Sequence, residues 1–367
     1  MTVAKRVPAR ASADLTRQAT LWGLALIVVV GLLWLLGGVL LPFVAGSALA
    51  YLLNPLTNRL ERLGIPRLVA ALVVISLFVM AFVLLILIIA PILGGQLAAF
   101  IENIPGYVGR VQTLLADPSR PWLSRFVGEG FTGADKSVGD LLTQGAGWLS
   151  AFLRSLWSGG QALLSIFSLV VVTPVVAFYL ILDWHRMVTV VDRAVPRQHV
   201  SSVREIAREI DAAIAGFVRG QTAVCLLLGS FYAVALSLTG LNFGLLIGLI
   251  SGLITFIPYV GSMTGLVLAL GVAVAQFAPE WTMIVTVLGI FLFGQFVEGN
   301  ILAPKLVGDS TGLHPVWLMF ALFAFGYLFG FVGLLLAVPL AAAIGVIVRF
   351  ALRQYMESTL YTGEAAD

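Results

Sequence analysis

The sequence has few charged residues: Asp, Glu, Lys and Arg make up only 11% of its 367 residues. Soluble domains are about a quarter charged and about 45–50% apolar, whereas 60% of this chain is apolar. This balance excludes a cytosolic enzyme, a nucleic-acid binder and a disordered scaffold. It predicts a polytopic protein whose main solvent is the lipid bilayer.

Cysteine and histidine are scarce as well. Cys225 is the single cysteine, so the chain cannot form an internal disulfide. The three histidines, His185, His199 and His314, are not paired at i,i+3 or i,i+4, so we expect no helix-borne metal site. No P-loop or dinucleotide-binding fingerprint occurs. We therefore expect no metal and no cofactor, and transport would have to use an ion gradient or the gradient of the solute itself.

Long apolar runs dominate the rest of the sequence. About 20 apolar residues cross a bilayer core of about 30 Å. Four runs predict single spans, at 68–90, 161–182, 222–239 and 281–297. Three longer stretches are cut by Gly or Pro: 21–56 at Gly37, Gly38 and Pro42, 242–277 at Pro258 and Gly261, and 316–348 at Gly326, Gly330 and Gly333. The predicted fold is an all-α integral membrane protein, a polytopic bundle with broken or re-entrant helical hairpins.

Basic residues predict how the chain is oriented. Lys and Arg cluster before residue 21, between 59 and 67, between 183 and 219, and at 349–353, and such clusters are typical of cytoplasmic segments. Both termini are therefore expected to be cytoplasmic. The predicted organisation is a tail at 1–20, membrane helices at 21–90, an extracytoplasmic amphipathic segment at 91–160, a span at 161–182, a cytoplasmic amphipathic region at 183–221, a membrane bundle at 222–350 and a tail at 351–367.

One helix is predicted outside the lipid, ahead of the span at 222–239. Ser202 and Glu205 have the spacing of a capping box, and apolar residues from Val203 to Phe217 recur every three to four positions. We expect this helix to lie along the cytoplasmic interface before it enters the span.

Polar groups and helix breaks near the membrane are the candidate functional positions. A break frees backbone groups that protein, water or a solute must satisfy, and transporters build binding sites at such breaks. Ionised groups are costly in lipid, so those that are retained tend to line a cavity. The pathway candidates are Gln221, Pro258, Tyr259, Gly261, Ser262, Gln295, Asn300, Gly330 and Gly333. The ion-coupling candidates are Glu298 and Asp183. The alternatives are an interfacial ion pair of Glu298 with Lys305, a plain interfacial Asp183, and structural kinks at the breaks.

Two further motifs resemble functional signals, but their sequence context favours a structural interpretation. The residues from Gly308 to Gly312 match the G-x-S-x-G pattern of a hydrolase, but membrane flanks instead of a strand and a helix favour a simple turn over catalysis by Ser310. Residues 48–50 resemble a signal cleavage site, but the apolar run before them is longer than the usual 7–15 residues. We therefore expect a first membrane hairpin and no enzyme activity.

Several of these motifs resemble the autoinducer-2 exporter family of permeases. The resemblance is carried by the residues at 173–183, 220–221 and 257–261, by Glu298-Gly299-Asn300, by the motif loop of Pro304, Lys305, Gly308, Gly312, His314 and Pro315, and by the residues at 329–340. It implies a location in the bacterial cytoplasmic membrane and export of the quorum-sensing signal autoinducer-2. It also leaves open sodium/proton antiport, which is ascribed to other members, and it supplies no agreed binding residues.

The sequence therefore favours a secondary transporter or exporter of a small polar solute, with autoinducer-2 as one candidate. A sodium/proton antiporter and a non-transporting oligomeric scaffold or regulator are the alternatives. The expected partners are the lipid bilayer and a small polar solute or cation, without nucleic acid, and a homo-oligomer is left open.

Overall fold

The structure is a computed structural model, and it describes residues 24, 28, 31–32, 35–115, 160–258, 260–307, 312–358 and 361. These residues form helices and turns, and seven of the helices are long and apolar enough to cross a membrane. The all-α fold predicted from the sequence is confirmed. Tyr259, Gly308, Ser310, the expected tail at 1–20 and most of the segment at 91–160 lie outside the described residues.

The first long helix, α2 (Gly37–Arg62), is continuous through Pro42 and Pro55. The predicted cut at Pro42 is therefore wrong. The reason is that Pro42 lies in the second turn of the helix, and α6 (Gly160–Ala194) packs closely against the next turn. A Cβ atom on Gly46 would overlap the side chain of Val176 on α6, so the two backbones approach closely and hold α2 in one piece.

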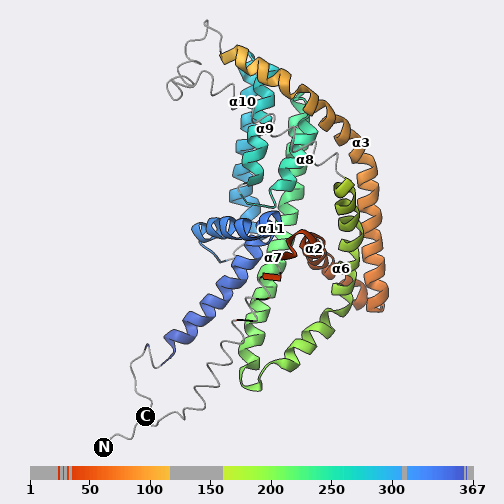
Figure 1. The fold of residues 1–367 in the computed structure, drawn as a ribbon, viewed down its shortest axis with the longest axis vertical. Helices are drawn as coiled ribbons and strands as arrows, with labels where there is room; N and C mark the ends of the chain where they lie inside the picture. Colours follow the sequence, from red (N-terminus) through yellow and green to blue (C-terminus); the bar gives the residue numbers. More distant parts are fainter. Residues whose placement is uncertain are drawn as a thin grey trace, which may run out of the picture.

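The second helix, α3 (Arg67–Leu115), is much longer than the predicted span that ends at residue 90. It has 49 residues, which is about 73 Å of helix, and it continues through Pro91 and Pro105. Its second half bends over the ends of α8 and α9 (Figure 1). There Phe100 and Ile104 are buried in the largest apolar cluster, and Gln96 Oε1 accepts a hydrogen bond from the Leu246 amide.

The central helix, α7 (Val200–Leu238), follows α6 and the short 3₁₀ helix Arg197–His199. It joins the predicted interfacial helix and the predicted span at 222–239 into one 39-residue element. The expected capping box does not form, because the helix begins at Val200 and its N-cap His199 makes no side-chain cap. Near the C-terminal end of α7, Tyr232 is fully buried and its ring stacks on Phe291 with centroids 4.6 Å apart.

The predicted break near Pro258 is confirmed. Helix α8 (Gly244–Ile254) ends before it and α9 (Val260–Phe277) begins after it. The chain folds back there and brings Gly261 close to Thr255. A Cβ atom on Gly261 would overlap the Thr255 backbone. Helix α10 (Trp281–Val297) has the bounds predicted for the fourth single span, and a π-helical segment (Glu298–Val307) continues from it.

The last helix, α11 (Pro315–Met356), contains a reversal at Gly330, where φ is 60° and ψ is −138°. Pairs of residues on either side of Gly330 lie together: Phe325 contacts Gly333, Gly326 contacts Leu334 and Leu313 contacts Gly345. Each pair is centred near Gly330, as two antiparallel arms require. The third stretch is therefore broken, as predicted. The first arm (315–329) is about 22 Å long, and its re-entry into the bilayer stays a prediction.

Candidate functional site

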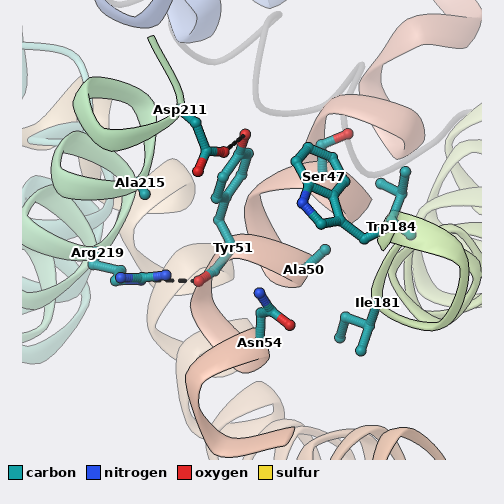
Figure 2. Close-up of a pocket in the computed structure, with 10 residues that line it drawn as sticks. Ser47, Ala50, Tyr51, Asn54, Ile181, Trp184, Asp211, Ala215 and Arg219 are labelled. Atoms are coloured by element: carbon teal, nitrogen blue, oxygen red, sulfur yellow. Dashed lines mark hydrogen bonds between the residues drawn. The ribbon is translucent and has the colours of Figure 1, made fainter. Parts of the chain in front are cut away.

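A polar pocket lies between α2, α6 and α7 (Figure 2). Its volume is about 240 Å³, and it is lined by Ser47, Ala50, Tyr51, Asn54, Leu180, Ile181, Trp184, Asp211, Ala215 and Arg219. Helix geometry explains the lining, because residues three to four positions apart share one face of a helix. Ser47, Tyr51 and Asn54 follow this spacing on α2, and Asp211, Ala215 and Arg219 follow it on α7.

Tyr51 joins the two charged groups of the pocket. Its hydroxyl donates a 2.9 Å hydrogen bond to Asp211 Oδ1, and its backbone carbonyl accepts a 3.0 Å bond from Arg219 Nε (Figure 2). On its other side the Tyr51 ring meets Trp184 of α6 edge to face, with centroids 6.1 Å apart. Asp211 and Arg219 are eight residues apart on α7, or about 12 Å along its axis, so the pocket offers an acceptor end and a donor end.

Arg67 does not line the pocket, but it holds two residues that do, Asn54 and Ile181. Its Nε and Nη2 both donate to the carbonyl of Ile181, at 2.9 and 2.8 Å, and Nη2 also reaches Asn54 Oδ1 at 3.4 Å. Its Nη1 forms a 2.9 Å ion pair with Glu61. One guanidinium at the start of α3 therefore links α2 to α6. It also binds the amide oxygen of Asn54, so the Asn54 amino group remains as a hydrogen-bond donor.

The pocket suits a small uncharged or zwitterionic polar solute. Asp211 and Arg219 carry opposite charges, so their summed charge is zero. Hydroxyl, amide and carboxylate groups converge on a volume that is below the range of about 300–1,000 Å³ usual for drug-sized ligands. Within the described residues, no three His, Cys, Asp or Glu side chains gather where they could hold a metal ion.

The structure brings some of the sequence-predicted residues together at the first helix break. Gln221 is buried, and its Nε2 donates a 2.6 Å bond to the carbonyl of Thr255, where α8 has just ended. Ser262 is buried as well, and Pro258 is half-buried. Gln221 therefore satisfies a carbonyl that the break has freed, which is a structural role.

The two predicted breaks contact each other. Ile257, next to Pro258, packs in one buried cluster with Leu322 of the first arm of α11 and Ala337 of the second. Gly333 is buried beside the reversal, whereas Gly330 at its tip is exposed. The breaks therefore form one unit in which the α8–α9 turn rests on the α11 hairpin.

The residues at the end of α10 form a separate polar group. Gln295 Nε2 donates a 2.8 Å bond to Glu298 Oε2, and Asn300 Nδ2 donates to the Phe296 carbonyl at 2.9 Å. Glu298 is half-buried, whereas Gln295 and Asn300 are exposed. Among the described contacts, Glu298 makes no ion pair with Lys305.

The motif loop has a capping role in the part that the structure describes. His314 Nδ1 accepts a 3.3 Å bond from the Val316 amide, and Pro315 is the first residue of α11. Arg349 Nη1 approaches the Gly312 carbonyl at 3.5 Å, so the loop rests on the second arm of the hairpin. Pro304 and Lys305 lie in the π-helical segment with exposed side chains. Asp183 is half-buried on α6 beside Trp184, but it does not line the polar pocket.

Sequence reasoning missed the main residues of the polar pocket, namely Tyr51, Asn54, Asp211 and Arg219. A usable signal was present, because Ser47, Tyr51 and Asn54 put three polar groups on one face of the segment 39–56, whose other residues are apolar. That pattern is typical of a helix that faces a cavity or a partner and not lipid on all sides.

Comparison with known proteins gives one consistent result. The family described as "AI-2E family transporter" matches residues 24–353. The chain is 31% identical to "Putative transport protein YrrI" of Bacillus subtilis (strain 168) over 87% of its own length and 88% of that protein. It is 28% identical to "Putative permease PerM" of Escherichia coli (strain K12), over 87% and 89% of the two chains. It is 27% identical to "AI-2 transport protein TqsA" of the same strain, over 91% and 93%.

Proposed function

The chain belongs to the AI-2E transporter family, a bacterial family of multi-pass membrane transporters and not of enzymes, and from this premise we propose that it exports a small polar solute through the polar pocket. The single observation that supports this site is the Tyr51 bridge between Asp211 and Arg219. It places hydrogen-bonding groups of both kinds between α2, α6 and α7, three helices that are long and apolar enough to cross a membrane. Polar and ionised groups that converge between membrane helices are typical of a solute pathway.

The proposed membrane orientation puts this pocket toward the cytoplasm. The basic residues in the last turn of α2 and at the start of α3, and those between the end of α6 and Arg219, would face the cytoplasm, as would both termini. A solute made inside the cell would then meet Asp211 and Arg219 first, which suits export.

Autoinducer-2 is our first candidate for the solute. TqsA, which is similar to this chain over nearly its whole length, is named an AI-2 transport protein. The pocket volume of about 240 Å³ fits a solute of that size class better than a peptide or a nucleotide.

We propose that the two helix breaks move during transport and that Glu298 couples transport to an ion. We propose that the α8–α9 turn and the α11 hairpin shift together, because they share the cluster around Ile257. Glu298 is the proposed coupling group for a proton or sodium ion, since it is half-buried next to an apolar helix and has one described partner, Gln295.

Transport in proteoliposomes tests the proposal. The purified full chain is reconstituted, labelled autoinducer-2 is supplied on one side, and its initial rate of movement is measured. Asp211→Asn and Arg219→Gln should each reduce the rate at least tenfold, because each removes one charged end of the pocket. Arg208→Gln is the matched control, since Arg208 is an exposed arginine on the same helix. Equal rates in all four proteins would reject the polar pocket as the solute site.

A further inference from the structure

An apolar groove adjoins the polar pocket. Its volume is about 690 Å³, nearly three times that of the pocket. It runs between α2, α7, the end of α8 and the second arm of α11, and almost all of its lining is aliphatic or aromatic. Ser47 and Tyr51 line both spaces, so the groove and the pocket meet at these two residues.

The groove opens toward the surroundings of the protein. Leu226, Leu253 and Phe331 line it and are 67%, 74% and 59% exposed. Leu226 and Phe331 belong to helices that are long and apolar enough to cross a membrane, and Leu253 belongs to the shorter apolar helix α8. Surface of this kind is stable only when apolar chains cover it.

The groove and the polar pocket together form one crevice. At its polar end, the guanidinium of Arg219 uses only part of its hydrogen-bonding capacity. Arg219 Nε donates to the Tyr51 carbonyl, and the two terminal nitrogens of Arg219 make no described hydrogen bond or ion pair with the rest of the described chain. A guanidinium with a free planar edge is well suited to a phosphate, which it can bind through two parallel hydrogen bonds. The crevice therefore has an anion-binding end and a long apolar end.

We propose that this crevice holds a phospholipid of the surrounding bilayer, with an acyl chain in the apolar groove and the phosphate at Arg219. The shape argues for a lipid over a free anion, because a free phosphate would leave the groove uncovered. The charge at Arg219 argues for a lipid over a second copy of this chain, whose covering surface would need an acidic group at that point. The lipid would lie beside Tyr51, and its phosphate would compete with the transported solute for Arg219.

The single cysteine of the sequence is a natural reporter for this site. Cys225 lines the groove and is half-buried. Its rate of alkylation by N-ethylmaleimide is measured on the full chain, purified in detergent and stripped of lipid. Phosphatidylglycerol with two oleoyl chains should slow the reaction several-fold. Inorganic phosphate and glycerol phosphate should not slow it, and dioleoylglycerol, which has the same chains and no phosphate, should protect much less.

Two variants with matched controls locate the two ends of the lipid. Ala343→Phe places a ring in the groove and should reduce the phospholipid retained per chain, whereas Ile344→Phe, at the exposed neighbouring position outside the groove, should not. Arg219→Gln should abolish the preference for phosphatidylglycerol over dioleoylglycerol, and Arg208→Gln should keep it. Bound phospholipid is counted by phosphorus analysis and native mass spectrometry, which do not depend on transport.

Three outcomes would overturn the lipid site. Protection of Cys225 by inorganic phosphate alone would mean a free-anion site. Equal protection by dioleoylglycerol would mean that Arg219 does not hold a phosphate. Protection that rises with protein concentration in the absence of lipid would mean that a second copy of the chain covers the groove. Loss of transport in a chain that still binds phospholipid would instead reject only the proposed transport function.

Discussion

The hydroxyl of Tyr51 on α2 donates a 2.9 Å hydrogen bond to Asp211 on α7, across 160 positions of sequence. This contact joins the helix pair α2–α6 to the central helix α7 at the wall of the polar pocket. Because the Tyr51 carbonyl also accepts from Arg219, any movement of α2 relative to α7 must break or exchange both bonds. A rearrangement of the pocket would therefore change the hydrogen bond between Tyr51 and Asp211.

Tyr51→Phe removes the hydroxyl and keeps the ring that packs on Trp184. The pocket is open to solvent, so water can replace part of the lost bond, and we expect a loss of about 0.5–1.5 kcal/mol in the free energy of unfolding. The same variant should lower the rate of solute transport several-fold. Thermal unfolding in detergent and transport in proteoliposomes measure the two effects.

The control for this substitution is Tyr179→Phe, because Tyr179 lies on α6 with 58% of its surface exposed and outside the pocket. A double-mutant cycle with Asp211→Ala, which removes the acceptor, isolates the contact. Fully additive effects of the two substitutions would show that the hydrogen bond contributes nothing to either property.

Gln221→Leu tests the link between α7 and the break after α8. Gln221 donates to the Thr255 carbonyl at 2.6 Å, and both residues are buried. The leucine leaves this carbonyl without a donor in an apolar setting, which costs about 1–3 kcal/mol. We expect a clear drop in the unfolding temperature, measured in detergent micelles. Gln198→Leu is the control, since Gln198 is exposed in the 3₁₀ turn. An equal drop in both variants would contradict the assigned role.

The breaks near Pro258 and at Gly330 were predictable because their cause is local. Pro258 lacks an amide hydrogen, and the glycines near it and near residue 330 allow conformations that other residues resist. The bounds of α10 were predictable for a similar reason, because polar or turn-forming residues flank one uninterrupted apolar run.

The length of α3 was not predictable from local rules. Pro91 and Pro105 indicate an end or a kink, yet the helix continues to Leu115. Tertiary packing outweighs the local cost, because Phe100 and Ile104 are buried in the apolar cluster where α3 crosses α8 and α9. The polar pocket was missed for a related reason. Tyr51 and Asp211 meet only when α2 is placed against α7, and nothing in either segment specifies that pairing.

Gly330→Ala tests the reversal in α11. Gly330 has φ 60° and ψ −138°, a backbone conformation that is essentially restricted to glycine, so alanine should cost about 1–3 kcal/mol. Gly289→Ala is the matched control, since Gly289 lies inside α10 with open space where a Cβ would be, and alanine favours a helix by up to about 1 kcal/mol. The two variants should therefore shift the unfolding temperature in opposite directions. A neutral Gly330→Ala would mean that the two arms do not need this turn.

Glu298→Gln tests the proposed ion coupling separately from solute binding. The amide keeps the size of the side chain and can still bond Gln295, which donates to Glu298 at 2.8 Å, but it cannot take up or release a proton. We expect solute exchange between the two sides of a proteoliposome to persist, while acceleration by an imposed proton or sodium gradient is lost. Glu280→Gln, at the exposed N-cap of the same helix, should keep the full response to the gradient. If the Glu298→Gln variant also keeps it, Glu298 has no coupling role, and its half-buried position serves only the packing of the π-helical segment against α7.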